Sequence, residues 1–222
     1  MDNTIVFDLE IQRAINTDKF EVMDGKYKCK IKGFENYYKE YPQELTDLKQ
    51  NGFNNVEVSG WGKIDKTLIS YGVIFDYEIN KLRVFDEQNV GELIERINRA
   101  DKVVGFNHIN FDYTVLSQYG TVNKSVLKDY DIMQKVQSKV GKKKGTGLDA
   151  IAHGTIGGNK SDDGADAPGM WLRGEHARLI NYCMDDVILT KDLYEFIMLN
   201  GYVIFNGDKL TVEGTNKEKS NV

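Results

Sequence analysis

The chain has 222 residues, of which 41% are hydrophobic and 28% are charged, as is usual for a soluble globular domain. Its formal net charge of −5 argues against a protein that coats nucleic acid with a broad basic surface. The two cysteines are too few for a disulfide framework or a four-cysteine metal site. Because we find no signal peptide and no apolar run of the ~20 residues that span a bilayer, we expect a cytoplasmic protein without a membrane partner.

The N-terminal part of the chain combines a short β-rich run with a long polar segment. Residues 4–10 (TIVFDLE) predict a core strand that ends in two carboxylates. Residues 20–66 are polar and aromatic, and we interpret them as an insertion or an elaborated edge of the domain. Within this segment, residues 35–50 have a helical spacing of apolar side chains, although Pro42 counts against an unbroken helix.

The rest of the chain alternates between β-rich and helical patterns. The predicted strands are residues 67–77 and 81–86, which form a hairpin, then 102–106 and 127–132, and a terminal hairpin at 202–212. The predicted helices are residues 90–100, 112–119, 148–152 and 175–199, with loop at 154–170. This order predicts an α/β domain with a mixed sheet flanked by helices. We expect residues 1–214 to form one domain and residues 215–222 to form a disordered tail.

Two carboxylates stand at the end of the first predicted strand. Asp8 and Glu10 are two residues apart, so a strand places both side chains on the same face. That face is otherwise apolar, and like charges held together there favour a bound cation. The alternative is that either residue caps the strand or pairs with a lysine.

A third carboxylate, Asp112, follows a hydrophobic strand and opens an apolar helix in the segment VVGFNHINFDYTVL. It is placed either as a helix N-cap or as a group that the strand end delivers to the edge where Asp8 and Glu10 lie. A fourth, Asp186, lies four residues after Tyr182 on the last predicted helix, so the two share a face. They form either a structural hydrogen bond or a metal ligand with a phenol beside it.

Four carboxylates from three separate segments suit hard divalent cations such as Mg²⁺ or Mn²⁺, which prefer oxygen ligands. Two such ions, roughly 3.5–4 Å apart, activate a water and stabilise the leaving oxygen in an in-line displacement at phosphorus. The pattern therefore predicts a two-metal site that hydrolyses phosphodiester bonds in nucleic acid.

The three segments together resemble the DEDD superfamily of 3′–5′ exonucleases, which includes the proofreading domains of DNA polymerases. FDLE matches Asp-x-Glu, NHINFD matches Asn-x₃-Phe-Asp, and YCMDD matches Tyr-x₃-Asp, which is similar to the DEDDy subgroup. The segments GFNHINFDYTVL, DYDIM, GLDAIA and LINYCMDDV more closely resemble the ribonuclease H-like exonuclease domain of bacterial and phage proteins, sometimes found beside helicases. The resemblance covers residues 3–15 and 67–200, and the segment 20–66 is longer than the usual connection.

This resemblance implies a role for each catalytic position. Asp8 ligates both metal ions, while Glu10 and Asp186 bind the ion that activates water. Asp112 holds the second ion through water, and Tyr182 orients the attacking water.

The substrate contacts implied by the resemblance are Leu9 and Phe111, which help to position the terminal nucleotide, and Asn107, as a structural or backbone contact. A glycine-bearing loop adds three lysines that are either a solvated charge run or phosphate contacts: Lys142, Lys143 and Lys144.

Three further kinds of residue have competing interpretations. Asp131 ends a predicted strand and is either an acid that approaches the metal edge without ligating the ions, or a turn or cap residue. Trp171 is interpreted as a core anchor ahead of the last helix. The three histidines share no ligand spacing, which argues against a zinc site.

We therefore expect a metal-dependent 3′–5′ exonuclease that acts on single-stranded DNA, with a helicase or polymerase as a possible partner. One rival is a nuclease that trims RNA or degrades oligonucleotides with the same site. The other is a non-catalytic module that binds nucleic acid or docks a partner.

Overall fold

A computed structural model describes residues 3–12, 20–23, 26–29, 68–125, 128–142, 144–159, 167–172 and 174–213. The helix predicted within 35–50, the tail at 215–222 and Lys143 lie outside these described residues.

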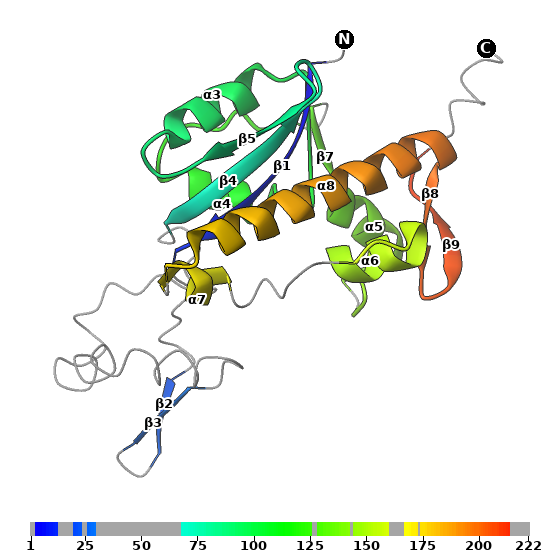
Figure 1. Cartoon of the computed structure of the whole chain (residues 1–222). Helices are drawn as coiled ribbons and strands as arrows, with labels where there is room; N and C mark the ends of the chain where they lie inside the picture. The colour runs from blue at the N-terminus through cyan, green and yellow to red at the C-terminus, as the bar shows by residue number, and fades with distance from the viewer. Residues whose placement is uncertain are drawn as a thin grey trace.

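A five-stranded mixed sheet forms the centre of the fold (Figure 1). Its order is β5-β4-β1-β6-β7, and β1 pairs antiparallel with β4 but parallel with β6. The strands are β1 (Thr4–Ile11), β4 (Ile69–Asp76), β5 (Lys81–Phe85), β6 (Lys102–Gly105) and β7 (Asp129–Asp131). The prediction of an α/β domain with a mixed sheet is confirmed.

Helices cover both faces of this sheet. On one face, α3 (Val90–Arg99) and α4 (Asp112–Leu116) share a hydrophobic cluster with Ile5, Phe7 and Leu9 of β1. On the other face, α5 (Ile132–Val140), α6 (Leu148–Ile156) and α8 (His176–Asn200) share a cluster with Val6 of β1. Figure 1 shows α8 running diagonally across this second face.

The alternation of side chains along β1 decides which groups face α8. Odd-numbered residues from Ile5 to Ile11 are buried among the residues of α3 and α4. Because successive side chains of a strand point to opposite faces, Val6, Asp8 and Glu10 face α8. The antiparallel register places Val73 opposite Asp8 and Tyr71 opposite Glu10 on the neighbouring strand.

Two hairpins form sheets of their own. Strands β2 (Phe20–Met23) and β3 (Lys26–Cys29) pair within the segment 20–66. Strands β8 (Tyr202–Phe205) and β9 (Asp208–Thr211) confirm the predicted terminal hairpin, with Asn206 and Gly207 at positive φ in its turn.

Two helices were missed by the sequence patterns. The chain enters α5 at Ile132 because the Asp131 side chain caps it, accepting a hydrogen bond from the N–H of Gln134 at 3.1 Å. The loop predicted at 154–170 is also wrong at both ends, since α6 extends to Ile156 and α7 (Ala167–Leu172) begins at Ala167. The Pro-Gly pair inside α7 reads as a turn, and this local signal hid the helix.

The two ends of the long segment after β1 are joined. The N–H of Gln12 donates to the carbonyl of Leu68 at 2.9 Å, and its side chain donates to the carbonyl of Ile69 at 2.8 Å. Gln12 and Leu68 therefore lie side by side at the end of the strand that carries Glu10. Among the described residues, no helix has the length and apolar character needed to cross a bilayer.

Candidate metal centre

The carboxylates of Asp8 and Glu10 project from β1 toward α8, as the strand alternation requires. Asp8 is half-buried, and Glu10 is only 8% exposed. Asp8 continues the apolar row that begins at Val6, so its charge lies at the edge of the cluster packed under α8. Burial of acids at this edge is costly unless a cation compensates them.

Asp186 comes to the same place from the middle of α8. Tyr182 and Asp186 are both buried on the helix face that packs against β1 and β4. One carboxylate oxygen from each of Asp8, Glu10 and Asp186 lies within 4.8 Å of the others. Residues almost 180 positions apart in the sequence therefore form one cluster.

Asp112 reaches the site from the opposite direction, at the start of α4. It is 2% exposed, and its Oδ1 accepts a hydrogen bond from the N–H of Leu9 at 3.1 Å. Strand β6 pairs with β1 only as far as Val6, so Asp112 supplies an acceptor beyond the point where the neighbouring strand ends. This contact holds the Asp112 carboxylate at the backbone of Leu9, the residue between Asp8 and Glu10. Asp112 is nevertheless outside the group of three carboxylates whose oxygens lie within 4.8 Å of one another.

The electrostatics of the cluster show an excess of negative charge. Burial, followed by the charge of Asp8, raises the pKa of Asp112 well above its usual range. Burial and the charges of Glu10, Asp186 and Asp8 raise the pKa of Tyr182, which stays a neutral phenol. The thiol of Cys183 lies 4.0 Å from Asp8 Oδ2, and its pKa is likewise raised, first by burial and then by Asp8.

The donor set fits hard divalent cations. All the converging groups of Asp8, Glu10 and Asp186 are carboxylate oxygens, which are the ligands that Mg²⁺ and Mn²⁺ prefer. A divalent ion among them would offset both the burial and the repulsion from Asp8 that raise the pKa of Asp112. The residues therefore suit the predicted cofactor by chemistry as well as by position.

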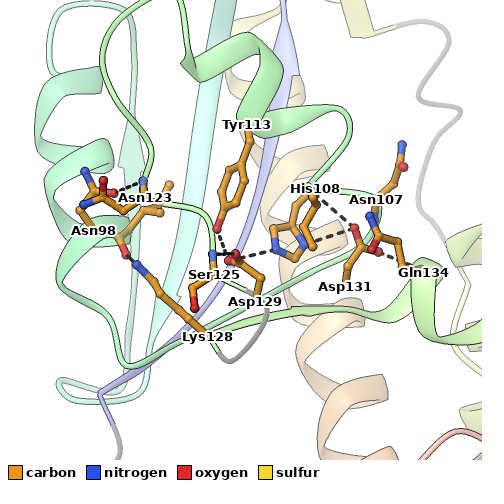
Figure 2. A network of polar contacts seen from close by, with 12 residues as sticks. Asn98, Asn107, His108, Tyr113, Asn123, Ser125, Lys128, Asp129, Asp131 and Gln134 are labelled. Atoms are coloured by element: carbon orange, nitrogen blue, oxygen red, sulfur yellow. Dashed lines mark hydrogen bonds and ion pairs between the residues drawn. The ribbon is translucent and has the colours of Figure 1, made fainter.

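The loop that presents Asp112 is organised by Asp131 (Figure 2). The Asp131 carboxylate accepts from the N–H of Asn107 at 3.0 Å and from the N–H of Ile109 at 3.3 Å, besides capping α5 through Gln134. Of the two interpretations of Asp131, the cap role is observed. The same carboxylate also ties the loop before α4 to the end of β7.

A buried histidine completes this support. Figure 2 shows His108 between two carboxylates, with Nε2 3.8 Å from Asp129 Oδ1 and Nδ1 3.7 Å from Asp131 Oδ2. The Tyr113 hydroxyl donates to Asp129 at 2.5 Å. A Cβ at Gly105 would lie 2.7 Å from the His108 ring, so only glycine lets the ring pack against the end of β6.

The residues expected to contact substrate are placed differently from one another. Leu9 is 3% exposed and packs with the residues of α3 and α4, on the face opposite Asp8. Phe111 is half-buried and immediately precedes α4. Asn107 has a φ of +66° and is half-buried. Lys142 and Lys144 are exposed in the loop after α5.

Sequence reasoning missed the groups that border the carboxylates without being acidic. Cys183 touches Asp8 through its thiol, which donates to the Asp8 carbonyl at 3.6 Å. Tyr71 lies opposite Glu10 only because of the register between β1 and β4. Cys183 could have been found from the sequence, because it directly follows Tyr182 on the same predicted helix. Tyr71 could not, because no local pattern indicates which residue of β1 it pairs with.

With this fold and acidic centre established, comparison with known families defines the class of the protein. A family model described as the RNase H superfamily matches residues 53–198, which is more than half of the chain, and the protein belongs to that superfamily. The matched range contains Asp112, Tyr182 and Asp186, while Asp8 and Glu10 precede it. The comparison with curated proteins found no match.

Proposed function

We propose that this RNase H superfamily protein is a 3′–5′ exonuclease that hydrolyses single-stranded nucleic acid with two Mg²⁺ or Mn²⁺ ions. The observation that carries the proposal is the convergence of Asp8, Glu10 and Asp186 within 4.8 Å. Asp112 joins them through its bond to the backbone of Leu9. Oxygen ligands gathered from three separated segments are what two-metal phosphodiester hydrolysis requires.

The chain's own carboxylates would hold the ions. Asp8 stands at the centre, since its charge acts on Asp112, Tyr182 and Cys183. Glu10 and Asp186 would hold one ion together with Asp8, and Asp112 would hold the second. When bound, the ions supply an activated water and stabilise charge on the leaving oxygen.

Tyr182 is the proposed positioning group for the attacking water. Its hydroxyl interacts with Asp186, and its raised pKa keeps the proton on the phenol at neutral pH. A neutral phenol both donates and accepts hydrogen bonds, so it orients a water without adding charge. The Tyr182 side chain is only 2% exposed, so the residues packed around it hold the ring in one place.

The direction of cutting and the preference for a single strand rest on the resemblance to DEDDy exonucleases. The Tyr-x₃-Asp spacing supports the DEDDy subgroup, because Tyr182 and Asp186 share one buried face of α8. A helicase or polymerase that delivers single-stranded 3′ ends is the proposed kind of partner.

The test is digestion of 5′-labelled single-stranded DNA and RNA of the same sequence, with Mg²⁺, with Mn²⁺ or with EDTA. We expect a ladder that shortens one nucleotide at a time from the 3′ end, only when a metal is present. Cleavage in EDTA would overturn the metal centre. Internal cuts would overturn the exonuclease polarity but not the centre, and RNA cleaved faster than DNA would identify an RNA-trimming enzyme.

A circular single strand of the same sequence is the matched control for polarity. It has the same bonds but no 3′ end, so the proposed enzyme leaves it intact. Binding of the linear strand without any cleavage would favour a non-catalytic module.

A further inference from the structure

Three aromatic rings meet beside the metal centre, and the mechanism above leaves them unused. They are Tyr71 on β4, Trp171 on α7 and His176 at the start of α8. The ring centroids lie 5.6 Å apart for Tyr71 and Trp171, 6.1 Å for Tyr71 and His176, and 5.0 Å for Trp171 and His176. The Tyr71 hydroxyl is 3.2 Å from His176 Nδ1, which fixes two of the rings relative to each other.

This aromatic cluster adjoins the carboxylates on two sides. Tyr71 is the register partner of Glu10, so the two side chains stand next to each other on one face of the sheet. Tyr71 and Trp171 also pack against the hydrophobic group that contains Tyr182. When the phosphate of a nucleotide lies at the metal centre, the base of the same nucleotide is therefore close enough to reach the aromatic rings.

The exposure of the rings distinguishes the cluster from ordinary core. Tyr71 and Trp171 are half-buried and His176 is exposed, whereas Met170 and Leu179 beneath them are fully buried. Tyr71 and Trp171 thus pack on buried apolar residues, while part of the surface of the three rings remains exposed. The prediction that Trp171 is a core anchor therefore holds for the part of its ring that packs on the buried residues, and not for the part that is exposed.

Charge explains why such a surface is needed there. The nearby groups are acids, so they repel the phosphates of a strand wherever metal ions do not compensate them. Aromatic rings bind bases by stacking, which does not depend on attraction to phosphate and tolerates every sequence.

We propose that Tyr71, Trp171 and His176 form a stacking platform for a nucleobase at the 3′ end of the bound strand. The platform holds the base of a nucleotide next to the phosphodiester at the carboxylates. This inference rests on the proposed function, because it takes the strand in that site as its ligand.

The experiment compares two substrates in a chain whose other tryptophan is replaced, Trp61→Phe, so that Trp171 is the remaining fluorophore. One oligonucleotide is an ordinary single strand, and the other lacks the bases of its last two nucleotides. Binding is measured in Ca²⁺ by Trp171 fluorescence and, with a labelled oligonucleotide, by anisotropy; cleavage is measured in Mn²⁺. Trp171→Leu removes the ring, Trp171→Phe keeps a stacking surface, and Tyr77→Leu is a control on a half-buried ring in the turn that follows β4.

The platform predicts that Trp171→Leu weakens binding of the ordinary strand and raises its KM by about tenfold, with kcat changed less than twofold. Trp171→Phe and Tyr77→Leu stay within about threefold of the parent. On the strand without terminal bases, Trp171→Leu and the parent behave alike, and that equal activity also shows that the variant is folded. Trp171 fluorescence is quenched by the ordinary strand and not by the other.

An equal loss on both substrates would overturn the platform and show a structural role for Trp171. Unchanged binding of the ordinary strand by Trp171→Leu would overturn it as well, while an active parent would leave the exonuclease proposal standing. Binding and quenching by a parent that cleaves nothing would support the platform and overturn the exonuclease. A parent that binds neither strand would overturn both.

Discussion

The carboxylate of Asp112 accepts a hydrogen bond from the backbone N–H of Leu9, a residue 103 positions earlier, at 3.1 Å. This contact joins the start of α4 to the stretch of β1 that carries Asp8 and Glu10. It places a fourth acid beside a cluster of three, in a position where its own ionisation is opposed by burial and by Asp8.

In the metal-free protein, the contribution of Asp112 to stability should fall as the pH rises. Its pKa is raised in the folded state, so above the unfolded value near 3.9 the unfolded chain releases a proton that the folded chain retains. Unfolding is thereby favoured progressively until the pH passes the folded pKa. Asp112→Asn removes this decline and raises Tm in EDTA at pH 7.5 by about 2–4 °C, measured by calorimetry from pH 4 to 8. The same slope in both proteins would contradict the assignment.

The pair Asp76 and Arg96 should give the opposite pH dependence. Arg96 donates to both oxygens of Asp76, at 2.6 and 2.8 Å, and both residues are buried. The hydrogen bonds from Arg96 lower the pKa of Asp76, so its contribution is present above the unfolded value and is lost as the pH falls through the folded one. Asp76→Ala leaves a buried guanidinium and should cost about 3–5 kcal/mol in urea unfolding at pH 7. A loss that is unchanged at pH 3 would show that Asp76 acts through packing alone.

Gly105 should not tolerate even a methyl group. A Cβ at this position would lie 2.7–2.9 Å from atoms of the His108 side chain, whose ring is held between Asp129 and Asp131. Gly105→Ala is expected to lower the free energy of unfolding by about 1–3 kcal/mol. The matched control is Gly91→Ala in α3, where an added Cβ would meet no atom within 4 Å apart from its chain neighbours and the backbone of its own helix, and this change should stabilise the helix by about 0.5–1 kcal/mol. If both substitutions had the same sign, the close packing of His108 would be refuted.

Tyr182→Phe should reduce turnover and leave metal binding intact. The change removes only the hydroxyl beside Asp186, so the carboxylates keep their places while the attacking water loses a partner. We expect kcat to fall about a hundredfold, with Mn²⁺ affinity by calorimetric titration unchanged within about twofold. Tyr194→Phe, at a buried tyrosine about three turns further along α8, is the control and should keep full activity. Loss of Mn²⁺ binding in Tyr182→Phe would instead make the phenol a part of the metal ligation.

The parts of the fold that follow a local period could be predicted from the sequence. The two-residue spacing placed Asp8 and Glu10 on one face of a strand, and the four-residue spacing placed Tyr182 and Asp186 on one face of a helix. The mixed sheet and the terminal hairpin follow from the same patterns.

What escaped prediction depends on contacts between distant segments. The helix after Asp131, α5, has only two buried residues, Ile132 and Val136. So short an apolar pattern does not indicate a helix, and the capping contact that starts α5 is visible only in the structure. The register of β1 against β4, which brings Tyr71 to Glu10, is set by pairing across some 60 residues and has no local signature. Sequence spacing therefore identified the acids, and the structure was needed to find the rings beside them.

The most direct test of the central claim compares two adjacent aspartates on α8. Asp186 is buried with the carboxylate cluster, and Asp185 is exposed on the surface of the same helix. Asp186→Ala and Asp185→Ala are incubated with 5′-labelled single-stranded DNA and Mn²⁺, and the rate of 3′-end shortening is compared with that of the parent. The metal centre predicts that Asp186→Ala reduces the rate by at least about a thousandfold, while Asp185→Ala stays within about twofold of the parent. Equal activity of the two variants would contradict it.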